Sequence, residues 1–258
     1  MAPAIRLRIV GSSPSVQRPG RVCSSYLLRT REASVLVDLG SGALGNLHLA
    51  IDYPQLDAVV ITHMHADHFL DLIPLRYALK YGPLLRDLRL PLWLPPGGSK
   101  MLRTICNAFA PEGTSDFLDE VFEVREFDPS RQLDIGDLKL TFCKTRHYID
   151  TYAVRAERDH SSVVYSSDTA PCDEVVELAR NCSLFLCEAT LGLGTENGCD
   201  RGHLSAEEAG DMAQRAGAHR LVLTHYSSTY AHDELMEAAV SRFKGRISIA
   251  DDGVELSV

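Results

Sequence analysis

The sequence has no apolar run that approaches the eighteen or so residues of a membrane-spanning helix. Residues 1–12 also lack the apolar core and cleavage signal of a secretory leader, so we expect a cytoplasmic protein with no membrane partner. The seven cysteines form an odd, scattered set without a Cys-x-x-Cys pair, which argues against a disulfide framework and a thiolate zinc site. No internal repeat or low-complexity linker divides the chain.

Acidic residues outnumber basic residues, and the formal net charge is −9 at pH 7. Long nucleic acids are held by clustered Lys and Arg, so this balance argues against them as the main partner. The charge is uneven, because residues 1–31 hold six arginines and no acid, whereas residues 111–137 hold nine acids and two arginines. The first segment is either a local basic face or ordinary solvated surface.

With 258 residues, 45% of them hydrophobic, the chain can bury a large core. Its most informative stretch is 59–68, where a short β-branched run ends in a loop with three histidines and one aspartate. Residues two apart in an extended loop point the same way, so His63 and His65 can bind one ion while Asp67 and His68 face a second position. The stretch therefore predicts a centre for two metal ions.

Three later strands each end in a single residue of a type that binds metals. The predicted strand 138–143 leads to His147, 162–167 leads to Asp168, and 221–224 leads to His225. Two ions that share a bridging carboxylate need about seven protein ligands, and the sequence supplies them. The expected ligands are His63, His65 and His147 for the first ion, Asp67, His68 and His225 for the second, and Asp168 as the bridge.

The rest of the chain alternates predicted strands and helices. Asp38, at the end of a predicted strand, could brace the metal loop by accepting an imidazole N–H, or could cap the next helix. The acidic stretch 111–127 is expected to be a helix that runs into a strand. Further strands are expected at 5–9, 23–28, 34–37 and 88–94, and helices at 44–51, 70–80 and 99–109. In the helix at 70–80, the residues expected to face the core are Leu72, Ile73, Leu75, Tyr77 and Leu79.

His203 stands just before a helix that we expect to begin at Ser205. Because a helix N-terminus disfavours imidazolium, a buried carboxylate such as Glu188 would have to keep His203 protonated for it to act as a general acid. Alternatively, Ser205 is an ordinary N-cap with Glu208 as its capping-box partner, and His203 is loop surface. The histidines without such a context, which we expect to be surface or structural, are His48, His160, His219 and His232.

The loop 62–68, followed in order by a single His, Asp and His, resembles the metallo-β-lactamase superfamily over nearly the whole chain. The resemblance implies an α/β fold, a four-layer αββα sandwich with the two-metal site along one edge. It also implies one domain over 1–258, made of two similar halves at about 1–130 and 131–258.

Three stretches are similar to ribonuclease Z and its phosphodiesterase relatives: 186–190 (Leu-Cys-Glu-Ala-Thr), 202–209 and 224–230. By this likeness His203, supported by Glu188, is the general acid that protonates the leaving oxygen. Ribonuclease Z usually has a long Gly/Pro-rich arm that grips tRNA, whereas Asp168 follows His147 by only twenty-one positions here, and Thr229 replaces an arginine of the family. The arm-less pattern, with the stretch 38–45, also looks like bacterial cyclic-nucleotide phosphodiesterases.

We therefore expect a hydrolase with two divalent ions, zinc first and manganese or iron as alternatives. A hydroxide between two cations is nucleophilic at neutral pH, and Asp67 could orient it as well as bind metal. The expected substrate is a phosphodiester, either an RNA 3′ end or a small or cyclic nucleotide. The alternatives are a lactonase or other ester hydrolase, and a non-catalytic, metal-stabilised RNA-binding homologue. Relatives are often dimers, so we expect a homodimer, with 70–94 as a candidate contact.

Overall fold

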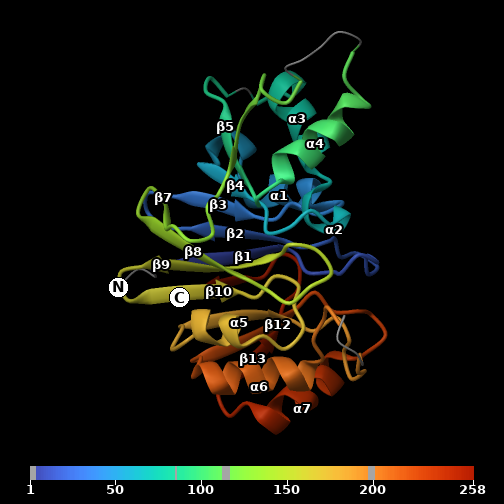
Figure 1. Ribbon diagram of the computed structural model, residues 1–258, viewed down its shortest axis with the longest axis vertical. Helices are drawn as coiled ribbons and strands as arrows, with labels where there is room; N and C mark the ends of the chain where they lie inside the picture. The colour runs from blue at the N-terminus through green and yellow to red at the C-terminus, as the bar shows by residue number, and fades with distance from the viewer. Residues whose placement is uncertain (1–3, 85, 112–116, 197–200) are drawn as a thin grey trace.

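Two mixed β-sheets lie face to face in the middle of the molecule, and helices cover the outer face of each sheet (Figure 1). The computed structural model describes residues 4–84, 86–111, 117–196 and 201–258. Its layers run helix, sheet, sheet, helix, which confirms the αββα sandwich that the family resemblance implied.

The first sheet has the strand order β14-β1-β2-β3-β4-β5-β6. The pairs from β14 to β3 are antiparallel, and the pairs from β3 to β6 are parallel. The parallel strand β4 is buried along its whole length, as a short β-branched run covered on both faces should be. The strands are β1 (Arg6–Gly11), β2 (Ser25–Arg29), β3 (Ser34–Val37), β4 (Ala58–Val60), β5 (Leu90–Leu94), β6 (Phe122–Glu126) and β14 (Glu255–Ser257).

The second sheet repeats this plan with the order β13-β12-β11-β10-β9-β8-β7. Its three antiparallel pairs run from β7 to β10, and its three parallel pairs from β10 to β13. The chain crosses from the first sheet to the second at residues 127–132, and β14 alone returns to the first. The strands are β7 (Leu133–Ile135), β8 (Leu138–Lys144), β9 (Tyr152–Arg158), β10 (Ser161–Tyr165), β11 (Leu184–Glu188), β12 (Arg220–Thr224) and β13 (Arg246–Ile249).

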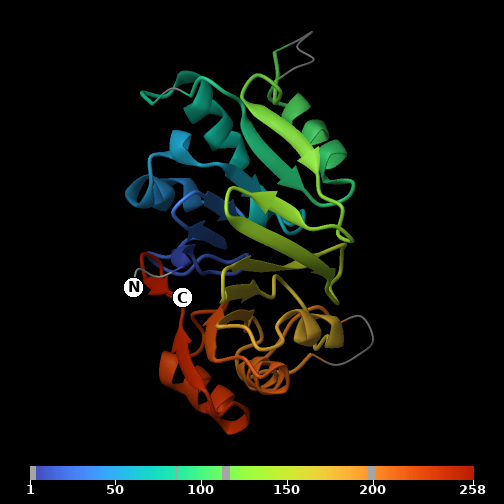
Figure 2. The ribbon, with the colours of Figure 1, turned by 90° about the vertical axis from the view of Figure 1, so that its left-hand side faces the viewer.

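The helices divide between the two outer faces (Figure 2). Those on the first sheet are α1 (Ala43–Ala50), α3 (Leu72–Tyr81) and α4 (Gly98–Asn107), with the short α2 (Ala66–Phe69) and a 3-10 turn η1 (Tyr53–Gln55). Those on the second sheet are α5 (Asp173–Leu178), α6 (Ala206–Ala216) and α7 (His232–Arg242). In the described ranges, no helix has both the length and the apolar character needed to cross a membrane.

Three apolar cores hold these layers together. One lies between the two sheets, where the Phe127 and Phe142 rings stack at 4.1 Å. The second lies between the first sheet and its helices, and the third between the second sheet and α5–α7. Side chains alternate along β8, so that Leu138, Leu140 and Phe142 enter the core between the sheets.

The helix expected at 70–80 is present, but only part of its core face was predicted correctly. Leu72, Leu75 and Leu79 are buried, at the three- and four-residue spacing of one helix face. Ile73 is partly buried and Tyr77 is 40% exposed, because both lie away from that face.

In the acidic stretch, the predicted strand is correct and is β6. The predicted helix falls partly on residues 112–116, which lie outside the described residues. The described residues 117–121 form turns instead, since Phe117 and Leu118 pack into the core of the first sheet's helices.

Candidate metal centre

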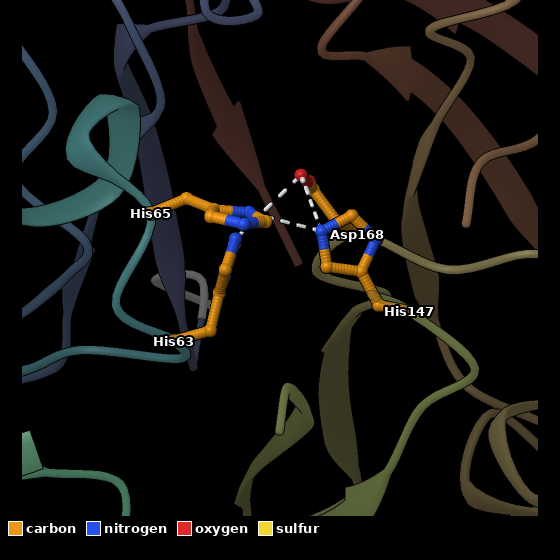
Figure 3. Close-up of side chains that lie close together, drawn as sticks. All are labelled: His63, His65, His147 and Asp168. Atoms are coloured by element: carbon orange, nitrogen blue, oxygen red, sulfur yellow. Dashed lines mark hydrogen bonds and ion pairs between the residues drawn. The ribbon is translucent and has the colours of Figure 1, made fainter. Parts of the chain in front are cut away.

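Loops that follow β4, β8, β10 and β12 meet at one edge of the sandwich, between the two sheets. They bring together all seven side chains that the sequence analysis expected to bind metal. Because each loop starts where a buried strand ends, the two sheets set the positions of these side chains. Figure 3 shows four of them.

The first group consists of His63, His65, His147 and Asp168, each of which offers one donor atom within 4.8 Å of the others. Nδ1 of His65 lies 3.1 Å from Nε2 of His147. Oδ2 of Asp168 lies 3.7 Å from Nε2 of His63 and 3.8 Å from Nε2 of His147. The four side chains point toward a common centre (Figure 3), as donors around one ion must.

The second group consists of Asp67, His68 and His225, also within 4.8 Å of one another. Nε2 of His225 lies 3.3 Å both from Oδ2 of Asp67 and from Nε2 of His68. Oδ1 of Asp168 lies 3.5 Å from Nε2 of His68, so the two oxygens of this carboxylate face the two groups. Asp168 therefore occupies the position that a bridging ligand requires.

Hydrogen bonds fix the orientation of three of the imidazoles. Nδ1 of His68 donates to Asp38, Nδ1 of His147 to the carbonyl of Gly202, and both bonds are 2.8 Å long. Nδ1 of His225 donates to the hydroxyl of Thr190, also at 2.8 Å. A proton held on Nδ1 leaves the lone pair of Nε2 free, and that atom faces the centre in each case.

Two buried polar atoms in the centre lack a partner in the described protein: Nε2 of His63 and Oδ1 of Asp168. A buried lone pair without a donor is unfavourable, and a cation in the first group would satisfy Nε2 of His63 while a cation in the second would satisfy Oδ1 of Asp168. Imidazole nitrogens with two carboxylates are also a donor set that suits zinc. The residues present therefore fit a pair of divalent ions.

The charges of the side chains agree with this donor role. Burial lowers the pKa of His63 well below its usual value, and lowers the pKa of His65 and His147 as well, which favours the neutral imidazole that binds metals. Burial opposes the charge of Asp67, but the contact with His225 and the charges of His68 and His225 together outweigh it and bring the pKa to about 2. Burial likewise opposes the charge of His68, yet Asp168 and Asp38 raise its pKa well above normal, so a proton and a cation compete for its Nε2.

Asp38 braces the metal loop and does not cap the helix. Its carboxylate accepts hydrogen bonds from the backbone N–H of Thr62 at 2.7 Å, the hydroxyl of Thr62 at 2.9 Å and Nδ1 of His68 at 2.8 Å. The N-cap of α1 is Gly42, so the capping interpretation of Asp38 is wrong. All three of these hydrogen bonds come from the segment that follows β4.

Three non-glycine residues of the centre have a left-handed backbone: Asp38 at φ 59°, Ser167 at φ 50° and His225 at φ 52°. Such conformations are unfavourable by roughly 1–3 kcal/mol each, and they persist where the surrounding structure holds them. Backbone strain of this kind gathers at functional sites.

His203 and Glu188 form a hydrogen-bonded pair beside the metal groups. Nδ1 of His203 donates to Oε1 of the fully buried Glu188 at 2.9 Å, and the His203 ring lies 4.9 Å from that of His147. Burial alone would lower the pKa of His203, but the charge and hydrogen bond of Glu188, together with the charges of Asp168 and Glu196, outweigh it and raise the pKa to about 9.

The two interpretations of the 203–208 stretch are both partly correct. Ser205 is the N-cap of α6 and forms a complete capping box with Glu208. His203 is nevertheless not loop surface, because its side chain is only 17% exposed and is bonded to Glu188.

Sequence reasoning missed two residues that support the centre. Thr190 accepts the hydrogen bond from His225 and donates one to Glu188 at 2.6 Å, so it connects the second metal group to the His203 pair. The sequence signal that could have indicated this role is the position of Thr190 at the end of the 186–190 stretch.

The second residue is Arg18. It is buried rather than part of a basic face, and its guanidinium lies 3.9 Å above the ring of Tyr226. Nothing in the local sequence pointed to that contact.

The family model of the β-lactamase superfamily domain matches residues 34–226. The chain belongs to the metallo-β-lactamase superfamily of hydrolases. The probable metallo-hydrolase YhfI of Bacillus subtilis is 28% identical to it, over 96% of this chain and 98% of YhfI. The crystal structure of YhfI matches with a TM-score of 0.88, over 98% of this chain and 99% of that one.

Two further proteins are similar to this chain over nearly their whole length. Ribonuclease Z of Mycobacterium bovis is 26% identical, over 96% of each chain. The crystal structure of a diphosphatase from the PhnP family has a TM-score of 0.76 at 20% identity, over 98% of this chain and 97% of that one, and shows the shared fold.

Proposed function

We propose that this member of the superfamily is a phosphodiesterase that uses two metal ions and cleaves a P–O bond in a small or cyclic nucleotide. The observation that carries the proposal is the His203–Glu188 pair, which stands beside the metal groups and leaves the Nε2–H of the imidazole available. An alkoxide leaving group needs a proton as its bond to phosphorus breaks, and this pair is placed to supply one.

The proposed ligands are those that the two groups of donors define. Asp168 lies between them and would bind both ions. When bound, two divalent cations lower the pKa of water between them to near neutrality and neutralise the non-bridging oxygens of a phosphate. His63, His65 and His147 would hold the first ion, and Asp67, His68 and His225 the second.

Three side chains have separate roles beyond binding. Glu188 accepts the Nδ1 proton of His203 and so fixes the ring with Nε2–H free to donate to the leaving oxygen. Asp67 is the least buried carboxylate of the centre, and its ionised form can accept a hydrogen bond from the attacking water and so orient it. Together these groups would orient the nucleophile and supply a proton to the leaving group.

A small substrate is favoured over tRNA by the segment between His147 and Asp168. This segment is fully described, and it consists of a loop and the hairpin of β9 and β10. It therefore holds no arm of the kind with which ribonuclease Z grips tRNA. The likeness to a ribonuclease and a diphosphatase supports chemistry at phosphorus.

The test compares leaving groups in protein whose bound metal has been counted. His203→Ala should keep both ions and lose about 10²- to 10⁴-fold in turnover of 3′,5′-cyclic AMP, whose leaving alkoxide is poor. Turnover of bis-p-nitrophenyl phosphate should fall much less, because its leaving group needs no proton. His219→Ala, at an exposed histidine, is the matched control and should change neither rate.

Equal losses on both substrates would remove the general-acid role of His203. A lactone hydrolysed well by both wild type and His203→Ala would instead favour the ester-hydrolase alternative. Cleavage of a tRNA precursor with a 3′ trailer, in preference to cyclic AMP, would instead identify an RNA 3′ end as the substrate. Metal-loaded protein that turns over none of these would favour the non-catalytic alternative.

We also propose zinc as the native metal, a homodimer as the assembly and the cytoplasm as the location. The imidazole-rich donor set supports zinc. Exposed apolar side chains on and after α3, among them Tyr81 at 69% and Leu88 at 76%, support a contact there. The cysteines in the described ranges are all unpaired, as in a reducing compartment. Elemental analysis and analytical ultracentrifugation test the first two.

A further inference from the structure

Tyr148 is an exposed aromatic residue at the border of the metal centre. It directly follows His147, and its ring lies 4.8 Å from the ring of His147 and 5.7 Å from the ring of His203. More than half of the residue, 52%, is nevertheless open to solvent. The protein therefore presents an aromatic surface directly beside the pair that we propose as the general acid.

The ring is exposed but held in place. Its hydroxyl donates a hydrogen bond to Glu196. The other oxygen of Glu196 accepts from the backbone N–H of Gly202 at 2.9 Å and of His203 at 3.3 Å. A hydrogen bond thus ties Tyr148 to the same loop that carries His203.

Gly202 allows this loop to approach the ring closely. A Cβ atom at this position would lie 2.6 Å from Cε2 of Tyr148 and 2.9 Å from Nδ1 of His147. Both distances are shorter than real Cβ contacts, so a side chain at position 202 would have to displace one of these rings. The Tyr148 ring is therefore held at its hydroxyl by Glu196, with the backbone of Gly202 beside its edge.

A fixed aromatic ring is suited to a flat, neutral partner. Stacking on such a ring loses little conformational entropy, because the ring is already ordered. The carboxylate of Glu196, which is bonded to the hydroxyl of Tyr148, would repel a second phosphate, and the nearby imidazole of His203 is already paired with Glu188. The chemistry of this border therefore favours a nucleobase over a further anionic group.

We propose that Tyr148 is a specificity-determining residue, whose ring stacks on the base of the nucleoside that carries the scissile phosphate. This inference rests on the proposed phosphodiesterase function and names its substrate class: nucleoside phosphodiesters rather than base-free sugar phosphodiesters. In a nucleotide the ribose separates the base from the phosphate. The ring of Tyr148 is likewise separated from the metal groups by the side chain of one proposed ligand, His147.

The test uses two substrates that differ only in the base. These are adenosine 3′,5′-cyclic phosphate and the 3′,5′-cyclic phosphate of a methyl riboside. Wild type should prefer the adenosine compound, and Tyr148→Leu should lose about five- to a hundredfold in kcat/KM for it, mainly through KM, while the base-free compound changes little. Tyr148→Phe keeps the ring, so it should keep most of the preference. Phe109→Leu, at an exposed aromatic residue just after α4, should behave as wild type.

A binding measurement separates this inference from the proposed function. Calorimetry with adenosine 5′-monophosphate and ribose 5-phosphate should show tighter binding of the adenosine compound to wild type, and loss of the difference in Tyr148→Leu. Equal binding of the two by wild type, or an equal effect of Tyr148→Leu on both, would overturn the stacking role. Base-dependent binding without any phosphodiester turnover would leave the stacking role intact and reject the proposed activity.

Discussion

Oδ2 of Asp38 accepts a hydrogen bond from Nδ1 of His68 at 2.8 Å, and neither side chain is exposed to solvent. The same carboxylate holds the backbone N–H and the hydroxyl of Thr62. One side chain at the end of β3 therefore fixes both the path of the metal loop and the tautomer of a proposed ligand.

The first prediction concerns this contact. Asp38→Asn places an amide where the carboxylate accepts three hydrogen bonds, so the ring of His68 loses its fixed orientation. We expect the affinity for the second ion to fall about 10- to 100-fold. Competition with a chromophoric chelator measures this affinity. Asp87→Asn, at an exposed position, is the control, and an unchanged affinity in folded Asp38→Asn protein would contradict the bracing role.

The second prediction uses two glycines five residues apart. A Cβ atom on Gly40 would lie 2.0 Å from the carbonyl oxygen of Asp67, so Gly40→Ala must displace the metal loop. We expect reduced metal content and a loss of roughly 1–3 kcal/mol in the free energy of unfolding. Gly45, in α1, has nothing within 4 Å of its added Cβ, and Gly45→Ala should instead stabilise by about 0.5–1 kcal/mol. Denaturant titration and metal analysis distinguish the two.

The third prediction concerns the support of His225. The hydroxyl of Ser12 accepts a hydrogen bond from buried Arg18 at 2.6 Å, and the carbonyl of Ser12 accepts one from the backbone N–H of His225 at 3.0 Å. Arg18→Gln removes this guanidinium and its contact with Tyr226, so we expect a loss of roughly 2 kcal/mol in stability and weaker binding of the second ion.

A lysine at position 18 should rescue little of this loss, because an ammonium lacks the planar face that stacks on the tyrosine ring. Arg31→Gln, at an exposed arginine, is the matched control. Normal metal affinity in Arg18→Gln would restrict Arg18 to a role in folding alone.

The fourth prediction is a pH dependence of stability. Burial opposes the charge of Glu208, but the hydrogen bond from Arg201 and the capping box outweigh it and lower its pKa. Because the folded pKa is depressed, the stabilisation is complete above the unfolded value of about 4.3 and disappears as pH falls through the folded value. Glu208→Gln should therefore be less stable than wild type by about 1 kcal/mol near neutrality, and the difference should disappear as the pH falls through the folded pKa of Glu208. If the free energies of unfolding of the two proteins changed in parallel with pH, this prediction would be contradicted.

The positions of the seven proposed ligands could be predicted because each depends on local sequence. Four of the proposed ligands lie within the six residues 63–68, so their spacing can be read directly from the sequence. The other three, His147, Asp168 and His225, each follow a recognisable strand. The support around them could not be predicted in the same way. Arg18 reaches Tyr226 across more than two hundred residues, and Tyr148 reaches Glu196 across forty-eight, so no periodicity of the chain records either contact.

The errors in the fold have a similar physical origin. Asp38 had two partners available to it, a helix N-terminus and the metal loop, and only the packing of β3 beside β4 decides between them. Tyr77 looked like a core residue from its hydrophobicity, but the direction in which α3 lies on the sheet leaves it exposed.

The proposed donors are contributed by both sides of the connection at 127–132: four from the first sheet's segment and three from the second's. Two polypeptides made by dividing the chain at that connection would each carry an incomplete set. The metal centre would then bind ions only after the two fragments reassociate. Metal binding could therefore be used to measure their reassociation.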